Sequence, residues 1–368
     1  MSTTLAVPAF VAGAVVSLLT SLVLVARLER VGERLGLSEA LLGMVAALAA
    51  DAPEVTAAVT AIAHHEQRVG AGVILGSNVF NFAALLGLGA VVAGRIGLHR
   101  RVILLGGGVA IWVAAVCLLT VVGAWSASWG LALAAGMLVA YLVVLGREGK
   151  GLDRLPIPGR WAAWLRSAIS EEEVELDEAI RPARGRWTDA VAAAAALAVV
   201  VIASATMERA ASDLGTRWAV PELVVGGLVL AAVTSLPNAV AAVYLAARGR
   251  GAATFSTALN SNTLNVVAGL LVPAVLLGLG RPSGQAILIT VWYVALTVAV
   301  LAVGYRHRGL GRITGGLIIA AYAGFAGSVL AVGYAIGAAT GVAAALGAAA
   351  TAIMAAGLAR RRVRAGSG

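Results

Sequence analysis

Two carboxylates, Asp51 and Glu54, lie inside an apolar stretch of this sequence rather than in one of its charged loops. They are three positions apart, so on a helix both side chains project from one face. A carboxylate buried at membrane depth is costly, and by default it indicates a functional site. Carboxylate oxygens are the ligands that hard cations prefer, and a carboxylate in a low-dielectric site also binds protons readily. The pair therefore predicts a site for a metal cation, a proton or both.

A proline accompanies the carboxylates and has a counterpart later in the chain. Pro53 lies between Asp51 and Glu54, and Pro237 lies in a similar second segment. Proline has no N–H, so each one frees the carbonyl four residues earlier, those of Ala49 and Val233. At membrane depth such backbone is tolerated only where it is buried in protein or lines a cavity. We therefore expect two broken helices whose free carbonyls are further oxygen ligands.

The segments around the two prolines repeat each other without a gap. DAPEVTAAV at 51–59 aligns with SLPNAVAAV at 235–243, and GSNVFN at 76–81 aligns with NSNTLN at 260–265. Each repeat is a helix, a short loop and a second helix. Identical residues at matching positions include the pairs Pro53 and Pro237, Ser77 and Ser261, Asn78 and Asn262, and Asn81 and Asn265. The polar residues that we expect to be cation ligands beside the carboxylates are Ser77, Asn81, Thr234, Ser235, Asn238, Ser261 and Asn265.

The elements that must position these residues are membrane helices. The chain is 60% hydrophobic and 12% charged, whereas a soluble domain carries about 25% charged residues. Several apolar runs exceed the roughly 18 residues that predict a spanning helix. The 45 glycines fall mostly within these runs, which suits closely packed membrane helices. Eleven candidate spans result, at 7–25, 40–62, 71–93, 102–122, 130–145, 190–207, 223–246, 253–277, 286–304, 313–332 and 336–359.

The basic residues predict the orientation of these spans. Most of the 27 Lys and Arg residues fall in alternate loops, on one face of the membrane, and the positive-inside rule makes that face cytoplasmic. The N-terminus is then outside and the C-terminus inside. An odd number of spans separates the starts of the two repeats, so the repeats are inverted, as in many secondary transporters.

This pattern predicts an all-α polytopic membrane protein of ten or eleven helices, with broken helices at a central ion site. We divide the chain into a first five-helix repeat at 1–146, a cytoplasmic linker at 147–188, a second inverted repeat at 189–335 and an additional C-terminal helix and basic tail at 336–368. The linker holds an amphipathic segment that we expect at the lipid surface. It also holds an acidic run at 171–178, where a regulatory cation site is a weaker alternative to a plain linker. The absence of a signal peptide and the basic inner face favour a prokaryotic plasma membrane.

These motifs resemble the cation/calcium exchanger superfamily, the group of sodium/calcium exchangers, whose repeats typically read G-T-S-L-P-E followed by G-S-N-I-F-N or -D. The matching segments here are AADAPE at 49–54 with GSNVFN at 76–81, and VTSLPN at 233–238 with NSNTLN at 260–265. The resemblance implies ten packed helices, alternating access by sliding of the first and sixth spans, and transported cations such as Ca²⁺, Na⁺ or H⁺ without a further cofactor. By motif position, the ligands it implies are Glu54, Ser77, Asn81, Thr234, Ser235 and Ser261.

The chain departs from the family pattern where the charge of the site is set. Asn238 replaces the glutamate of the second repeat, and Asn265 replaces a common acidic residue. Asp51 replaces a serine, and Ala50 replaces a threonine. Both carboxylates therefore come from the first repeat. Because calcium sites depend on ligand charge, we expect altered ion selectivity or stoichiometry.

Two other classes of function are possible interpretations of the sequence. A non-transporting scaffold or regulator that keeps the fold is favoured by the neutral Asn238 and Asn265 and opposed by the retained Glu54. A membrane enzyme would need a catalytic constellation, but HHE at 64–66 lacks the i, i+4 histidine spacing of a zinc helix. The single cysteine excludes an internal disulfide. We therefore predict a cation antiporter, not an enzyme, with inorganic cations and lipid rather than nucleic acid as its partners.

Overall fold

The computed structural model of the protein describes residues 3–37, 39–146, 159–177 and 185–334. The expected eleventh span at 336–359 and the basic tail lie outside the described residues. So do the side chains of the acidic run at 171–178. Within the described residues, eight helices are long and apolar enough to cross a membrane, and two further pairs of bent helices raise the number of spans to ten. The predicted ten-span core and its all-helical class are thus confirmed.

The first half of the chain forms five spans and one linker helix. Labels with η denote π-helical segments, in which the helix is locally wider than an α-helix. In chain order the elements are α1 (Thr3–Arg34), α2 (Glu39–Ala50), α3 (Ala52–Ala63), α4 (Gln67–Asn81), η1 (Phe82–Gly87), α5 (Leu88–Ala93), β1 (Arg95–Gly97), α6 (Arg100–Val121), α7 (Ala127–Gly146) and α8 (Gly159–Asp177).

The second half repeats this plan. Its elements are α9 (Trp187–Arg217), α10 (Glu222–Val224), η3 (Val225–Leu230), α11 (Ala231–Thr234), α12 (Leu236–Ala247), α13 (Gly251–Leu264), η4 (Asn265–Leu271), α14 (Val272–Leu277), α15 (Gly284–His307), β2 (Gly309–Gly311) and α16 (Arg312–Gly333). The spans α2–α3 and α10–α12 are the bent pairs. The π-helical segments η1 and η4 begin at or directly after the last asparagine of each repeat motif.

The core of the bundle is built around two spans. The apolar window of the span from α4 to α5 is 94% buried and that of the span from α13 to α14 is 72% buried, against 22% for α1. Glycines let the central backbones touch: a Cβ added at Gly76 of α4 would lie 2.3 Å from the carbonyl oxygen of Gly227 in η3. The motif helices are therefore held in a densely packed interior, while α1 presents most of its surface outward.

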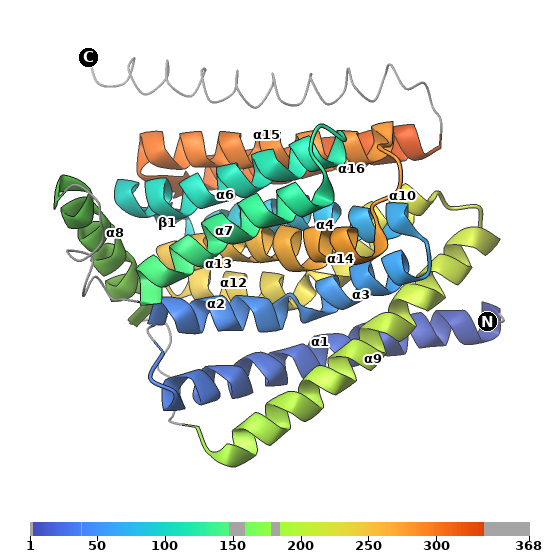
Figure 1. The fold of residues 1–368 in the computed structure, drawn as a ribbon, viewed down its shortest axis with the longest axis horizontal. Coiled ribbons are helices and arrows are strands. Elements are labelled where there is room, and N and C mark those ends of the chain that lie inside the picture. Colours follow the sequence, from blue (N-terminus) through green and yellow to red (C-terminus); the bar gives the residue numbers. More distant parts are fainter. Residues whose placement is uncertain (1–2, 38, 147–158, 178–184, 335–368) are drawn as a thin grey trace.

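The long helices α1 and α9 pack on each other along one side of the bundle (Figure 1). Ser17 and Ser204 share a buried hydrogen bond of 2.8 Å near the middle of this contact. At one end, Asp189 accepts a hydrogen bond of 2.6 Å from the guanidinium of Arg27. Polar contacts thus join α1 to α9 in addition to apolar packing.

The linker helix α8 lies across one end of the bundle, which we call the α8 end (Figure 1). There it packs on α2, α6 and α13, with Ala162 and Ala168 buried and Trp161 exposed. At the same end, β1 and β2 pair antiparallel, so that the loop after α5 and the loop after α15 are joined. The predicted amphipathic segment is present, and its apolar side contacts the helix bundle.

Candidate cation site

The break between α2 and α3 places the two carboxylates. The helices bend by 50° at Asp51, two residues before Pro53. The second-repeat helices α11 and α12 bend by 46° at Ser235, two residues before Pro237. Asp51 and Ser235 adopt nearly the same backbone angles, with φ of −79° and −82° and ψ of −8° and −2°. Each proline lies in the first turn of the new helix, where its missing N–H costs nothing. The prediction of two equivalent broken helices is confirmed.

Asp51 is completely buried and is bound by donors from the second repeat. Its Oδ1 accepts a hydrogen bond of 2.6 Å from the hydroxyl of Ser261 and another of 2.6 Å from the side-chain amide of Asn238. The other oxygen, Oδ2, is buried and has no hydrogen-bond partner. Asp51 thus offers one free carboxylate oxygen in the interior of the protein.

Glu54 is also completely buried, and its two oxygens face two amides. Oε1 accepts a hydrogen bond of 3.3 Å from the amide of Asn238, and Oε2 accepts one from the amide of Asn265. The hydroxyl of Ser235 lies beside the same carboxyl group. Within the part of the chain that the structure describes, the hydrogen-bond partners of Glu54 and Asp51 are amides and hydroxyls, and none is a basic side chain.

The charge of the site is therefore balanced only by dipoles. The carboxylates of Asp51 and Glu54 share the amide nitrogen of Asn238, so their oxygens lie within about 6 Å, where two charges repel by about 3 kcal/mol at an effective dielectric constant of about 20. A cation between them would replace this repulsion by attraction to both. Electrostatics thus favour a cation at this place.

Three hydroxyls from the two repeats converge on one backbone carbonyl, that of Ala231. Ser235 donates to it at 2.7 Å, Ser77 at 3.3 Å and Thr234 at 3.4 Å. Thr234 also donates to Leu230 at 2.8 Å. Since each hydroxyl hydrogen is directed at a carbonyl, the lone pairs of these oxygens remain available to a cation.

Four buried oxygen atoms of the site have no hydrogen-bond partner. They are Oδ2 of Asp51 and the side-chain carbonyl oxygens of Asn81, Asn238 and Asn265. An unsatisfied buried polar atom costs about 1–3 kcal/mol, so native proteins carry few of them. One carboxylate oxygen and three amide oxygens form a donor set suited to a hard cation.

The structure brings the nine predicted side-chain ligands into this one cluster, every one of them at most 1% exposed. Their role as ligands remains a proposal, as does that of the carbonyls of Ala49 and Val233. Two asparagines of the cluster, Asn78 and Asn262, were not predicted to belong to the site. Their identity in both repeats was the available signal, and the sequence does not indicate what they contact.

The histidines of the HHE segment contribute to a different contact. His64 donates from Nδ1 to the carbonyl of Thr60 at 2.7 Å and meets the guanidinium of Arg209 with its other nitrogen. Glu66 accepts a hydrogen bond of 2.5 Å from Ser212. Among the described residues, no group of three or more His, Cys, Asp or Glu is arranged to hold a metal.

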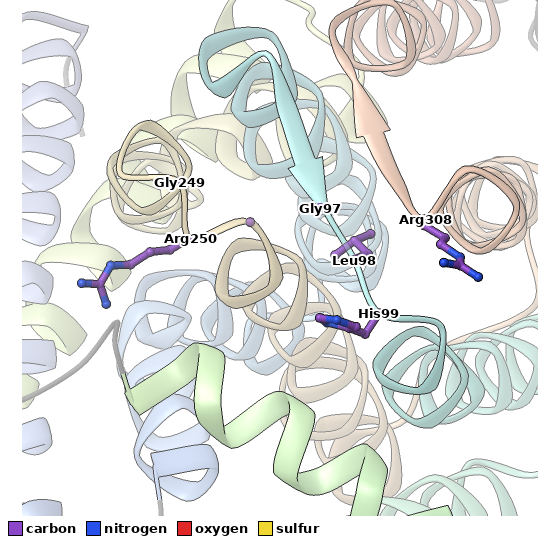
Figure 2. Close-up of a pocket in the computed structure, with 7 residues that line it drawn as sticks. Gly97, Leu98, His99, Gly249, Arg250 and Arg308 are labelled. Carbon is purple, nitrogen blue, oxygen red and sulfur yellow. The ribbon is translucent and has the colours of Figure 1, made fainter.

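A surface pocket of about 420 Å³ opens at the α8 end (Figure 2). It is lined by glycines of the turn between α12 and α13 together with Leu98 and His99 after β1. The side chains of Arg250 and Arg308 border it but point away from each other. No carboxylate lines this pocket, so the buried cluster is the candidate cation site.

Comparison with solved structures shows which known proteins share this fold. The chain is similar to the sodium-calcium exchanger NCX_Mj soaked with 2.5 mM Na⁺ and 10 mM Sr²⁺, with a TM-score of 0.56, 18% identity, and coverage of 87% of this chain and 97% of that one. It is also similar to the H⁺/Ca²⁺ exchanger CAX, with a TM-score of 0.66, 11% identity, and coverage of 96% and 92%. These likenesses establish the fold. Among curated protein sequences, none matches the chain.

The sequence pattern of one family covers most of the chain. The family described as sodium/calcium exchanger protein matches residues 5–147 and 189–331, which contain both motif segments and all the predicted ligands. Together with the ten-span fold and its inverted halves, this match confirms the resemblance to the sodium/calcium exchangers. The chain belongs to the sodium/calcium exchanger protein family.

Proposed function

We propose that this protein is a secondary active cation antiporter that works by alternating access at the Asp51–Glu54 site. The observation that carries the proposal is the group of four unpartnered oxygens, one from Asp51 and three from asparagine amides, at a site with two fully buried carboxylates. A purely structural polar network would be expected to satisfy these atoms, because leaving them unpaired costs free energy. A transported cation would supply the missing partner.

The charge of the site supports a particular stoichiometry. Asp51 and Glu54 carry two negative charges when both are ionised, and Asn238 and Asn265 add none. One divalent cation neutralises them, and so do two monovalent cations. We therefore propose exchange of one Ca²⁺ for two Na⁺ or two H⁺, so that no net charge crosses the membrane. A site with a third carboxylate would favour an additional positive charge.

The relatives support calcium as one of the ions. The similar structures are a sodium-calcium exchanger soaked with Na⁺ and Sr²⁺ and an H⁺/Ca²⁺ exchanger. We propose Ca²⁺ as the divalent ion and leave Na⁺ and H⁺ as the two candidates for the counter-ion. The loop charges support a plasma membrane location of a prokaryotic kind, with the N-terminus outside and the α8 end in the cytoplasm.

The test is flux in liposomes that contain the purified full chain. Ca²⁺ uptake is followed under an imposed Na⁺ gradient, an imposed H⁺ gradient or neither, with Glu54→Gln and Asp51→Ser as matched neutral variants. We expect one gradient to drive uptake and both variants to abolish it. A lack of flux for all three cations would contradict the antiporter and favour a non-transporting scaffold that keeps the fold.

Clamping the membrane potential with K⁺ and valinomycin tests the stoichiometry. Moving one net charge through 100 mV changes the free energy by about 2.3 kcal/mol, which would alter flux several-fold. Electroneutral exchange should instead proceed at the same rate at zero and at 100 mV. A steep dependence on potential would contradict the two-for-one ratio while leaving the antiporter intact.

A further inference from the structure

Asn78 and Asn262 occupy equivalent positions in the two repeats and bind each other. The side-chain amide of Asn78 donates to the backbone carbonyl of Asn262 at 3.2 Å, and the amide of Asn262 donates to the backbone carbonyl of Asn78 at 3.1 Å. Both residues are buried, with exposed fractions of 0% and 1%. This reciprocal pair joins α4 to α13 and is what a two-fold relation between the repeats produces, since each residue contacts its own equivalent.

The reciprocal pair fixes the orientation of both amides. A backbone carbonyl can only accept a hydrogen bond, so the group directed at it must be the NH₂ end of each side chain. The oxygen ends of Asn78 and Asn262 must then face elsewhere. Oδ1 of Asn78 accepts from the amide of Asn265 at 3.2 Å, and Oδ1 of Asn262 accepts from the amide of Asn81 at 3.1 Å.

This contact determines which end of each ligand amide is free. Asn265 directs its NH₂ at Asn78 and at Glu54, and Asn81 directs its NH₂ at Asn262 and Ser261. Because nitrogen and oxygen are at opposite ends of a planar amide, the two oxygens point away from these partners. They are two of the four buried oxygens of the site that have no hydrogen-bond partner.

We propose that Asn78 and Asn262 are positioning residues that hold the ligand asparagines of the opposite repeat with their oxygens toward the cation. The proposal rests on the proposed function, since it assigns a role within the same site. It makes a crossed arrangement: Asn78 acts through Asn265, and Asn262 acts through Asn81. In each case the ligand that is positioned belongs to the other repeat.

The crossed arrangement has two arms, the contact of Asn78 with Asn265 and the contact of Asn262 with Asn81. One arm can be removed by substitution while the other is kept. Asn78→Ala removes the acceptor for Asn265 but keeps the backbone carbonyl of residue 78, to which Asn262 donates. The orientation of Asn81 by Asn262 should therefore persist. Loss of an orienting partner typically lowers metal affinity by about 10- to 100-fold. We expect the half-saturating Ca²⁺ concentration to rise by that factor in Asn78→Ala.

The decisive measurement uses Asn265→Asp as a second background. A carboxylate at 265 presents oxygen at both ends, so it needs no orientation, and one of its oxygens is opposed by Oδ1 of Asn78. In that background Asn78→Ala should leave Ca²⁺ affinity unchanged or improve it, which is the reverse of its effect in the wild type. A role in packing alone would lower affinity in both backgrounds, and that outcome would overturn the proposal.

Two double variants, one within a repeat and one across the repeats, provide the control. Asn78→Ala combined with Asn81→Ala should give multiplied losses, because these residues are on different arms. Asn78→Ala combined with Asn265→Ala should lose little more than Asn265→Ala alone. Equal, multiplied losses in both combinations would also overturn the crossed arrangement.

The readouts are Ca²⁺-dependent flux in liposomes and the Ca²⁺-dependent rise in the unfolding midpoint of the purified chain. Asn78→Ser replaces Asn78→Ala if the alanine variant does not elute as a single folded species. If the wild type neither transports Ca²⁺ nor is stabilised by it, the proposed function fails together with this inference. If the wild type responds and the crossed effects are absent, the inference alone fails.

Discussion

Asn238 provides the most direct test of how this site balances charge, through the substitution Asn238→Glu. In the structure its amide donates to Asp51 at 2.6 Å and to Glu54 at 3.3 Å. A hydrogen bond to a charged group contributes about 1.5–3 kcal/mol. A third carboxylate would remove both bonds and add repulsion of about 4 kcal/mol for each charge pair about 4 Å apart at an effective dielectric constant of about 20.

These values predict opposite effects with and without calcium. Removing one partner of a buried charged network typically destabilises a protein by about 3–5 kcal/mol, so the ion-free variant should unfold well before the wild type. Divalent calcium would attract all three carboxylates, so the variant should bind Ca²⁺ at least about tenfold more tightly, which corresponds to about 1.4 kcal/mol. At saturating Ca²⁺ the stabilisation by binding should exceed that of the wild type by at least this amount.

Unfolding in detergent over a series of Ca²⁺ concentrations measures both effects. Asn238→Gln is the matched control, because it lengthens the side chain equally without adding charge, and it should show neither the large loss nor the steep recovery. If Asn238→Glu is as stable as the wild type without calcium, the amide does not balance the carboxylates as described. If calcium stabilises the variant no more than the wild type, charge count does not limit affinity at this site.

Three further predictions concern the packing that holds the site. Gly76→Ala should destabilise the protein by about 1–3 kcal/mol or more, because its Cβ would lie 2.3 Å from a backbone oxygen. The control Gly108→Ala, with open space around it, should change stability by less than about 1 kcal/mol. Equal unfolding midpoints of the two variants would contradict the close helix contact. Ser17→Ala should cost about 0.6 kcal/mol and Ser204→Ala should add little more to it, because both remove one hydrogen bond, and a double-mutant cycle with strictly additive losses would contradict that bond. Cys117, which is completely buried, should react with a membrane-permeant maleimide only when the chain unfolds, and rapid labelling of the folded protein would contradict its burial.

Much of the fold could be predicted from the sequence, because membrane spans depend on composition over long windows. The ten spans of the described chain agree with the predicted runs, and the breaks at Asp51 and Ser235 follow from Pro53 and Pro237. The π-helical segments were not predicted, since their extra width depends on packing against neighbouring helices. The pairing of β1 with β2 was also missed, because strands of three residues carry almost no periodic signal.

The composition of the site could be predicted, but its internal contacts could not. Repeat alignment selected side chains that the structure brings into one buried cluster, yet it treated Asn238 only as an oxygen ligand. In the structure its NH₂ end donates hydrogen bonds to Asp51 and Glu54 and so offsets part of their negative charge. Which end of an amide faces a neighbour depends on the surrounding donors and acceptors, and these come from both repeats. Asn78 and Asn262 were missed for the same reason.

The bridge that Asn238 makes between the two carboxylates has a consequence for the transport cycle. Strict exchange requires that the carrier without a bound ion switch only slowly between its outward-facing and inward-facing states. Each released ion must then be replaced by another before the protein switches back. The amide of Asn238 donates to both carboxylates, and these hydrogen bonds would offset part of the repulsion between Asp51 and Glu54 whenever no cation is bound. Without a bound ion, the wild type should therefore switch between these states more readily than the Asn238→Glu variant. We expect slippage, the downhill loss of Ca²⁺ into solution free of exchangeable cations, to be measurably faster in the wild type.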